Sequence, residues 1–144
     1  MAVKPIPDGY RTITPYLTVD DLAAMLTFLE RVFDAQITEK LTAEDGSPRH
    51  AEVVIGDSKV MLGQSSDQWK RRTASLYLYV EDTDALYTRA VDAGAKTLME
   101  PTDQFYGDRN AGVEDAEGNH WWIATHVEDV SSEEMERRAK VRMK

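Results

Sequence analysis

The sequence predicts an α+β fold in which one βαβββ module occurs twice. Residues 15–21 (Pro-Tyr-Leu-Thr-Val-Asp-Asp) and residues 76–82 (Leu-Tyr-Leu-Tyr-Val-Glu-Asp) follow the same plan, about 61 residues apart. In each stretch an alternating strand pattern leads directly into an acidic helix start. A doubled small module usually places its working surface between its halves, so we expect the functional residues on the open faces of the two sheets.

The first half reads as strand, helix and three further strands. Residues 12–19 alternate, with Ile13, Pro15, Leu17 and Val19 on one face, which is typical of a strand. Asp20 or Asp21 then caps a helix. The helix carries one apolar stripe, formed by Leu22, Met25, Leu26, Leu29, Val32 and Phe33, that must pack against the strand. Strands are predicted over 36–42, 50–55 and 59–63, joined by turns at 45–48 and 56–57.

The second half repeats this order. We expect a strand over 75–80, a helix over about 82–93 and strands around 96–99, 111–115 and 120–126. The helix turns Leu86, Ala90 and Ala93 inward and ends at Gly94. Residues 103–109 are predicted to form a loop whose aromatic side chains could close over a pocket.

The length suits a single domain over residues 1–144. Within it we place module 1 at about 11–64, a polar linker at about 65–72 and module 2 at about 73–127. A C-terminal helix at about 131–143 begins with the capping-box spacing of Ser131 and Glu134.

Composition excludes several classes of function. The chain has 26 acidic and 17 basic residues and a formal charge of −9, which disfavours nucleic acid and anionic membranes as partners. It has no cysteine, so disulfides, thiolate metal sites and a cysteine nucleophile are excluded. The first ten residues lack the pattern of a signal peptide. We therefore expect a cytoplasmic protein.

Four motifs point to a known family. They are residues 49–52 (Arg-His-Ala-Glu), 56–58 (Gly-Asp-Ser), 106–109 (Tyr-Gly-Asp-Arg) and 118–130 (Gly-Asn-His-Trp-Trp-Ile-Ala-Thr-His-Val-Glu-Asp-Val). Over residues 12–130 the chain resembles the vicinal oxygen chelate superfamily of glyoxalase, bleomycin-resistance and extradiol dioxygenase proteins, and in particular its PhnB-like branch. The resemblance implies paired βαβββ modules that form an open, curved mixed sheet, and a homodimer.

The resemblance also implies four positions for a divalent metal ion. Matching the family's strands places them at Thr14, Met61, Ser75 and Trp122. A thioether is a weak ligand and an indole has no lone pair to give, so the usual metal site looks replaced. We therefore expect no metal and no other cofactor.

Strand alternation predicts which side chains line the open faces. They are Tyr16, Thr18, His50, Glu52, Met61, Tyr77, Tyr79, Arg109, His120 and Trp122, to which the loop adds Tyr106. Tyrosine and tryptophan rings stack on planar or cationic ligands, while hydroxyl, imidazole and guanidinium groups orient polar atoms. Such a lining suits a drug-sized molecule.

Four of these side chains have two interpretations. His50 and Glu52 could be a general base with its orienting partner or half of a relocated metal site, but we favour a hydrogen-bonded pair that braces the sheet. Trp122 could stack on a ligand or fill the place of the metal. Arg109 could bind a carboxylate or phosphonate, but we favour an ion pair with Asp108 or Glu52.

Three hypotheses for function remain. The first is a metal-free binding protein that encloses a small aromatic or cationic molecule, as bleomycin-resistance proteins do. The second is a glyoxalase- or dioxygenase-type enzyme, a lyase or isomerase, with a non-standard divalent-metal site at His50, Glu52 and His120. The third is a degenerate domain kept as a scaffold. No phosphate-binding glycine loop or nucleophile elbow is present, so nucleotide-binding and hydrolase classes are disfavoured.

Overall fold

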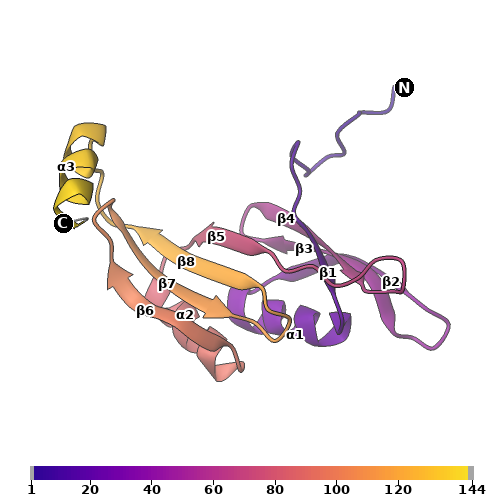
Figure 1. Ribbon diagram of the computed structural model, residues 1–144. Coiled ribbons are helices and arrows are strands. Elements are labelled where there is room, and N and C mark those ends of the chain that lie inside the picture. The colour runs from indigo at the N-terminus through magenta and orange to yellow at the C-terminus, as the bar shows by residue number, and fades with distance from the viewer. Residues whose placement is uncertain (1, 143–144) are drawn as a thin grey trace. The chain divides into compact units, whose positions relative to one another are not determined.

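The computed structural model describes residues 2–142 and contains both βαβββ modules, as Figure 1 shows. Module 1 consists of β1 (Tyr16–Val19), α1 (Leu22–Phe33), β2 (Gln36–Thr42), β3 (Pro48–Ile55) and β4 (Ser58–Gln64). Module 2 consists of β5 (Ser75–Tyr79), α2 (Thr83–Asp92), β6 (Lys96–Asp103), β7 (Asp108–Glu114) and β8 (His120–His126), followed by α3 (Ser132–Arg142). The chain divides into two compact units between Ala74 and Ser75, and each is described by itself.

Each module forms a four-stranded mixed sheet with the same strand order. The order is β1-β4-β3-β2 in the first sheet and β5-β8-β7-β6 in the second. In both sheets the first and last strands of the module pair in parallel, and the remaining pairs are antiparallel. The predicted α+β class and the doubled βαβββ order are confirmed.

The core of module 1 lies between α1 and one face of its sheet. The six residues of the predicted helical stripe are all buried. They pack on the inward residues of the strands, which are Leu17, Val19, Ala51, Val53, Val60 and Leu62. Asp21 is the N-cap of α1, because its Oδ1 accepts a hydrogen bond from the Ala24 N–H at 3.0 Å.

The core of module 2 is smaller on the helix side. Ala90 is buried and Leu86 is half-buried, while Ala93 is the C-cap and Gly94 follows it with a φ of 99°. Glycine adopts this left-handed conformation without steric cost, which ends the helix where the sequence predicts. Trp121 is fully buried on this side of the sheet, and its Nε1–H donates to Asp115 Oδ2 at 2.8 Å.

Two predicted details are wrong. The first strand begins at Tyr16 instead of residue 12, so Ile13 is 83 % exposed and is not a core residue. The loop predicted over 103–109 is a tight turn of residues 104–107, because β6 extends to Asp103 and β7 begins at Asp108. The ends of these strands are polar, so they lack the apolar alternation by which strands are recognised.

Helix α3 begins as predicted. The Ser131 Oγ accepts a hydrogen bond from the Glu134 N–H at 3.1 Å, which is half of a capping box. The predicted end of this helix at residue 143 lies outside the described residues. No helix within residues 2–142 has the length and apolarity needed to cross a membrane.

Candidate functional site

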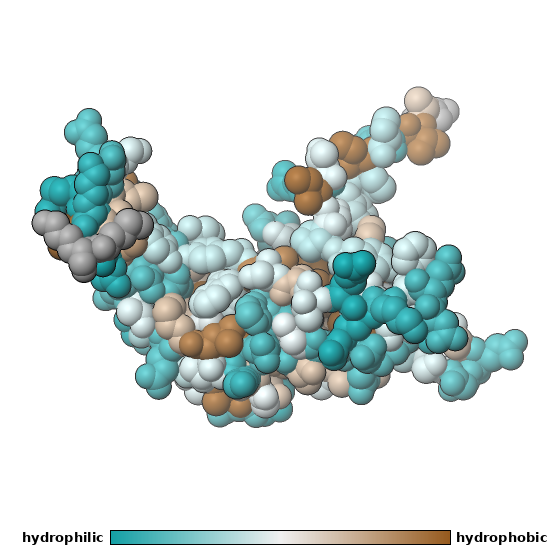
Figure 2. Space-filling model, viewed as in Figure 1, coloured by the Kyte–Doolittle hydropathy of each residue, from teal (hydrophilic) through white to brown (hydrophobic). Residues whose placement is uncertain are grey.

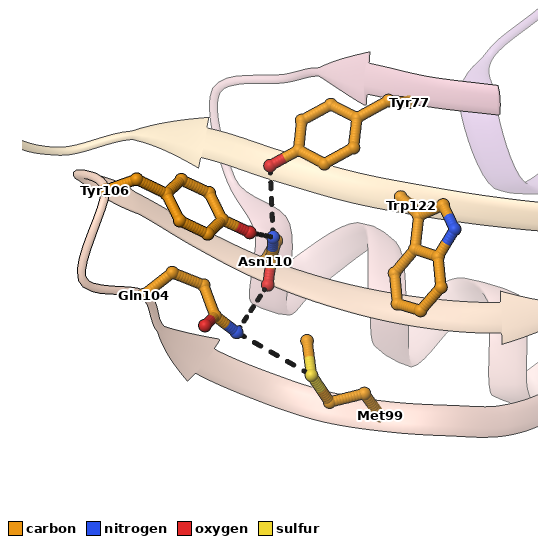
Figure 3. Close-up of a pocket in the computed structure, with 6 residues that line it drawn as sticks. All are labelled: Tyr77, Met99, Gln104, Tyr106, Asn110 and Trp122. Carbon is orange, nitrogen blue, oxygen red and sulfur yellow. Dashed lines mark hydrogen bonds between the residues drawn. The ribbon is translucent and has the colours of Figure 1, made fainter. Parts of the chain in front are cut away.

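Module 2 has a cavity of about 300 Å³ on the face of its sheet opposite α2. One side chain from each strand reaches it, and the turn between β6 and β7 adds two more (Figure 3). The lining consists of Tyr77, Met99, Gln104, Tyr106, Asn110 and Trp122. Three aromatic rings and a thioether provide apolar surface, and two amides provide polar atoms, which is a lining typical of small-molecule sites.

Asn110 holds the polar side of this cavity together. Its Nδ2 donates to the Tyr77 hydroxyl at 3.0 Å and to the Tyr106 hydroxyl at 2.8 Å. Its Oδ1 accepts from Gln104 Nε2 at 3.0 Å, so the side chain is fully used by its neighbours. Asn110 is only 3 % exposed. The walls of the cavity are therefore fixed before any ligand arrives.

One polar group of the lining remains available to a ligand. The Tyr106 hydroxyl is already used, because it accepts from Asn110 Nδ2 and shares a hydrogen bond with the Tyr77 hydroxyl. The Gln104 Nε2 is used by Asn110 and by the Met99 sulfur, but the Gln104 Oε1 accepts no hydrogen bond from any described residue (Figure 3). The cavity thus offers a ligand one acceptor between aromatic rings.

Trp122 on β8 forms one wall of the cavity. Its Nε1–H donates to Ser75 Oγ at 3.2 Å, which fixes the orientation of the indole. On the neighbouring strand, Gly112 pairs with Trp122, and a Cβ at this glycine would collide with the six-membered ring. The indole can lie flat against the sheet because Gly112 has no side chain.

The buried carboxylate of Asp108 holds the hydroxyl groups of Tyr77 and Tyr79 in place. Asp108 Oδ2 accepts from the hydroxyls of Tyr77 at 2.7 Å and Tyr79 at 2.9 Å, and Oδ1 lies 3.0 Å from His126 Nδ1. Burial alone would raise the pKa of Asp108, but the hydrogen bonds from His126, Tyr77 and Tyr79 outweigh it and hold the pKa below its ordinary value. Asp108 is therefore a charged acceptor.

The partners of Asp108 respond to its charge. Burial and then the hydrogen bond to Asp108 raise the pKa of Tyr77, so this side chain is a neutral phenol at physiological pH. Hydrogen bonds to Asp108 and then to Asp129, whose Oδ1 lies 2.7 Å from His126 Nε2, raise the pKa of His126. The imidazolium form suits this place, because both ring nitrogens face carboxylates.

Module 1 brings four of the predicted side chains together on its open face. Strand pairing places Met61 beside Tyr16 on one side and beside Glu52 on the other. His50 Nε2 lies 3.2 Å from Glu52 Oε2, and His50 Nδ1 lies 3.4 Å from the Tyr16 hydroxyl. The result is a continuous row of phenol, imidazole and carboxylate.

Other predicted residues lie elsewhere. Arg109 was placed on the open face, but it points to the helix side and forms ion pairs with Asp84 of α2 at 2.9 Å and Asp103 at 3.2 Å. The predicted partners Asp108 and Glu52 are therefore also wrong. The reason is the strand start: β7 begins at Asp108, and Arg109 alternates with Asp108 and Asn110, which take the open face.

Tyr79 and His120 do lie on the open face of module 2, outside the cavity lining. The ring of Tyr79 is largely exposed and stacks edge-on against Tyr77. His120 Nε2 lies 3.0 Å from Glu114 Oε1.

Sequence reasoning missed Asn110, Gln104 and Met99. Gly112 pairs with Trp122, and Asn110 lies two residues before Gly112 on the same strand. Residues two apart in a strand share a face, so this spacing would have placed Asn110 on the open face.

The family follows from comparison with known proteins. The model of the Glyoxalase/Bleomycin resistance protein/Dioxygenase superfamily matches residues 11–123. The chain belongs to this superfamily. It is also 33 % identical over 135 residues to an uncharacterised protein of Mycobacterium bovis, covering 86 % of this chain and 89 % of that protein.

Solved structures of the superfamily fold agree. TioX from Micromonospora sp. ML1 superposes with a TM-score of 0.71 at 24 % identity, covering 81 % of this chain and 99 % of TioX. A PhnB protein from Bacillus cereus superposes with a TM-score of 0.63 at 19 % identity, covering 80 % of this chain and 99 % of that one. The predicted resemblance to the superfamily, with a PhnB protein among its structural neighbours, is confirmed.

The side chains at the superfamily's metal positions do not suit a metal ion. In module 2, the indole of Trp122 has no lone pair to give, and its N–H donates to Ser75 Oγ, a neutral hydroxyl that is a poor metal ligand. In module 1, Thr14 precedes β1 and Met61 offers only a thioether. Within residues 2–142, no three His, Cys, Asp or Glu side chains are grouped so that they could hold a metal ion.

Proposed function

We propose that this protein binds a small, planar aromatic molecule in the cavity of module 2 without a metal ion, in the manner of a sequestering bleomycin-resistance protein. The observation that carries the proposal is the cavity of about 300 Å³ between Tyr77, Tyr106 and Trp122. Aromatic rings in contact with a flat ligand contribute about 0.5–1.5 kcal/mol each beyond the area they bury.

The polar atoms of the cavity narrow the class of ligand. The Gln104 Oε1 accepts no hydrogen bond from a described residue, so it matches an N–H or O–H donor on a ligand. A flat heterocycle that carries such a donor on its edge satisfies this acceptor while its ring contacts the aromatic side chains. It fits the cavity better than a flexible aliphatic compound.

The cavity also supports binding over a purely structural role. Here Gly112 leaves room for the Trp122 ring on the sheet, and Asn110 holds Tyr77 and Tyr106 at the rim.

Superfamily membership supports two further parts of the proposal. We propose that two copies of the chain form a homodimer and that the protein acts in the cytoplasm, as the resemblance implies. Light scattering tests the first part, because a monomer has a mass of 16.3 kDa and a dimer twice that value.

A thermal-shift screen tests the proposed binding. Planar heterocycles, aromatic antibiotics and divalent ions are added separately, each with and without a chelator. A ligand at about one hundred times its Kd stabilises the folded state by about 2.7 kcal/mol, which raises the melting temperature. We expect aromatic compounds to act in the presence of the chelator.

Two matched tryptophan variants show where the stabilising ligand binds. Trp122→Ala should abolish the ligand-induced shift, whereas Trp69→Ala should retain it, because Trp69 is 67 % exposed and lies outside the cavity. Stabilisation by a divalent ion, with no aromatic compound active, would instead support the hypothesis of a metal-dependent enzyme.

A further inference from the structure

Glu52 on β3 of module 1 has an unusual environment for a carboxylate. Its side chain is 10 % exposed, and Oε2 has His50 Nε2 as a partner at 3.2 Å. The other oxygen, Oε1, is buried and is the one buried side-chain nitrogen or oxygen among the described residues without a hydrogen-bond partner. An isolated buried acceptor of this kind costs about 1–3 kcal/mol, and more if it is charged.

The side chains around Glu52 do not supply the missing donor. The neighbouring Met61 carries no N–H or O–H group. Lys59, on the same strand as Met61, directs its ammonium to the Tyr10 ring at 4.8 Å and to Thr38 Oγ1 at 3.2 Å. Among the described residues, the side chain of Glu52 has a hydrogen-bonding partner only in the imidazole of His50.

Tyr16 lies beside His50, the partner of Glu52, as a movable aromatic side chain. Gly63 has no Cβ, and this lets the Tyr16 ring cross β4 toward His50, whose ring centroid lies 5.9 Å away. The ring is 54 % exposed, and its hydroxyl has only the 3.4 Å contact with His50 Nδ1. A side chain held by one long hydrogen bond can swing aside at little cost.

We propose that Glu52, with His50 and Tyr16, is a binding site for the primary ammonium group of a small organic amine. The ammonium donates one N–H to Glu52 Oε1 and supplies the missing positive charge. The Tyr16 ring then packs against the organic part of the amine, with a cation-π contribution. This site belongs to module 1 and is independent of the cavity proposed in module 2.

The test uses two probes that differ only in charge and donor number. Benzylammonium chloride and benzyl alcohol are titrated into the full-length protein, and the Met61 methyl and His50 ring signals are followed by NMR. We expect saturable benzylammonium binding, with benzyl alcohol at least about tenfold weaker, since a charge-assisted hydrogen bond is about twice as strong as a neutral one. This comparison needs no variant.

Two matched variants then test whether binding depends on the charge of Glu52. Glu52→Gln keeps the shape but removes the charge, and should weaken benzylammonium binding by at least about tenfold. Glu114→Gln alters the other Glu–His pair, at 3.0 Å from His120, and should bind as the wild type does. The proposal is overturned by equal affinity for both probes, by no saturable binding of benzylammonium, or by a folded Glu52→Gln variant within about twofold of wild type.

Discussion

The six-membered ring of Trp122 on β8 lies over Gly112 on β7, at the one place in the pocket floor where the neighbouring strand has no side chain. At the corresponding position in module 1, Met61 on β4 pairs with Glu52 on β3. The two modules therefore share a backbone plan but differ at this pair. In module 2 the missing side chain admits an indole, and in module 1 the retained carboxylate lies beside a thioether.

Replacing Gly112 by alanine should displace the Trp122 ring, because the new methyl group would overlap it. Overpacking of this kind costs about 1–3 kcal/mol of unfolding free energy, measurable by urea denaturation. The control is Gly63→Ala, where the methyl group meets only the end of the exposed Tyr16 side chain and should cost less. Equal losses in the two variants would contradict this account of the pocket floor.

Replacing Asn110 by alanine should both destabilise the protein and loosen the pocket. The change leaves the Tyr77, Tyr106 and Gln104 side chains without their common partner. Loss of a buried hydrogen-bonding side chain costs about 1–3 kcal/mol. Gln104→Ala removes one of the three hydrogen bonds and should cost less. If denaturation curves of Asn110→Ala match the wild type, the proposed network is not what holds the rim.

The protonation of His126 should make the stability of the folded protein depend on pH. Its folded-state pKa is raised by Asp108 and Asp129, so its stabilising effect is fully present below its unfolded pKa of about 6.5 and is lost as the pH rises through the higher folded value. The melting temperature of wild type should therefore exceed that of His126→Gln by more at about pH 5.5 than at about pH 8.5. A difference that does not change with pH would contradict the role of the imidazolium.

Arg138 should slow amide hydrogen exchange in the turn that carries Tyr106. Its guanidinium donates to both carboxylate oxygens of Glu128 at 2.9 and 3.1 Å and to the Phe105 carbonyl at 3.0 Å, so α3 is tied to residues 104–107. Arg138→Ala should speed hydrogen exchange at Gly107 and Val127. Arg137→Ala is the matched control, because among the residues that the structure describes Arg137 pairs only with Glu134. Unchanged exchange in Arg138→Ala would show that the turn does not depend on α3.

The sequence was sufficient for the fold because its patterns are local. The apolar stripe of α1 repeats with the helical period, and the alternation in β8 repeats with the strand period. Strand pairing places Tyr16, Met61 and Glu52 on one face of the first sheet, and Tyr77 and Trp122 on one face of the second. The polar hairpin ends have no such period, which is why Arg109 was assigned to the wrong face. The unpaired oxygen of Glu52 arises from tertiary burial and leaves no mark in the sequence.

The central claim is that Trp122 contacts a planar ligand without a metal ion. The most direct measurement follows the indole N–H signals of ¹⁵N-labelled protein during titration with planar heterocycles in the presence of EDTA. The account predicts that bound compounds shift the Trp122 signal and leave the signal of the exposed Trp69 unchanged. It is contradicted if no compound shifts the Trp122 signal, or if a shift appears only after a divalent ion replaces the chelator.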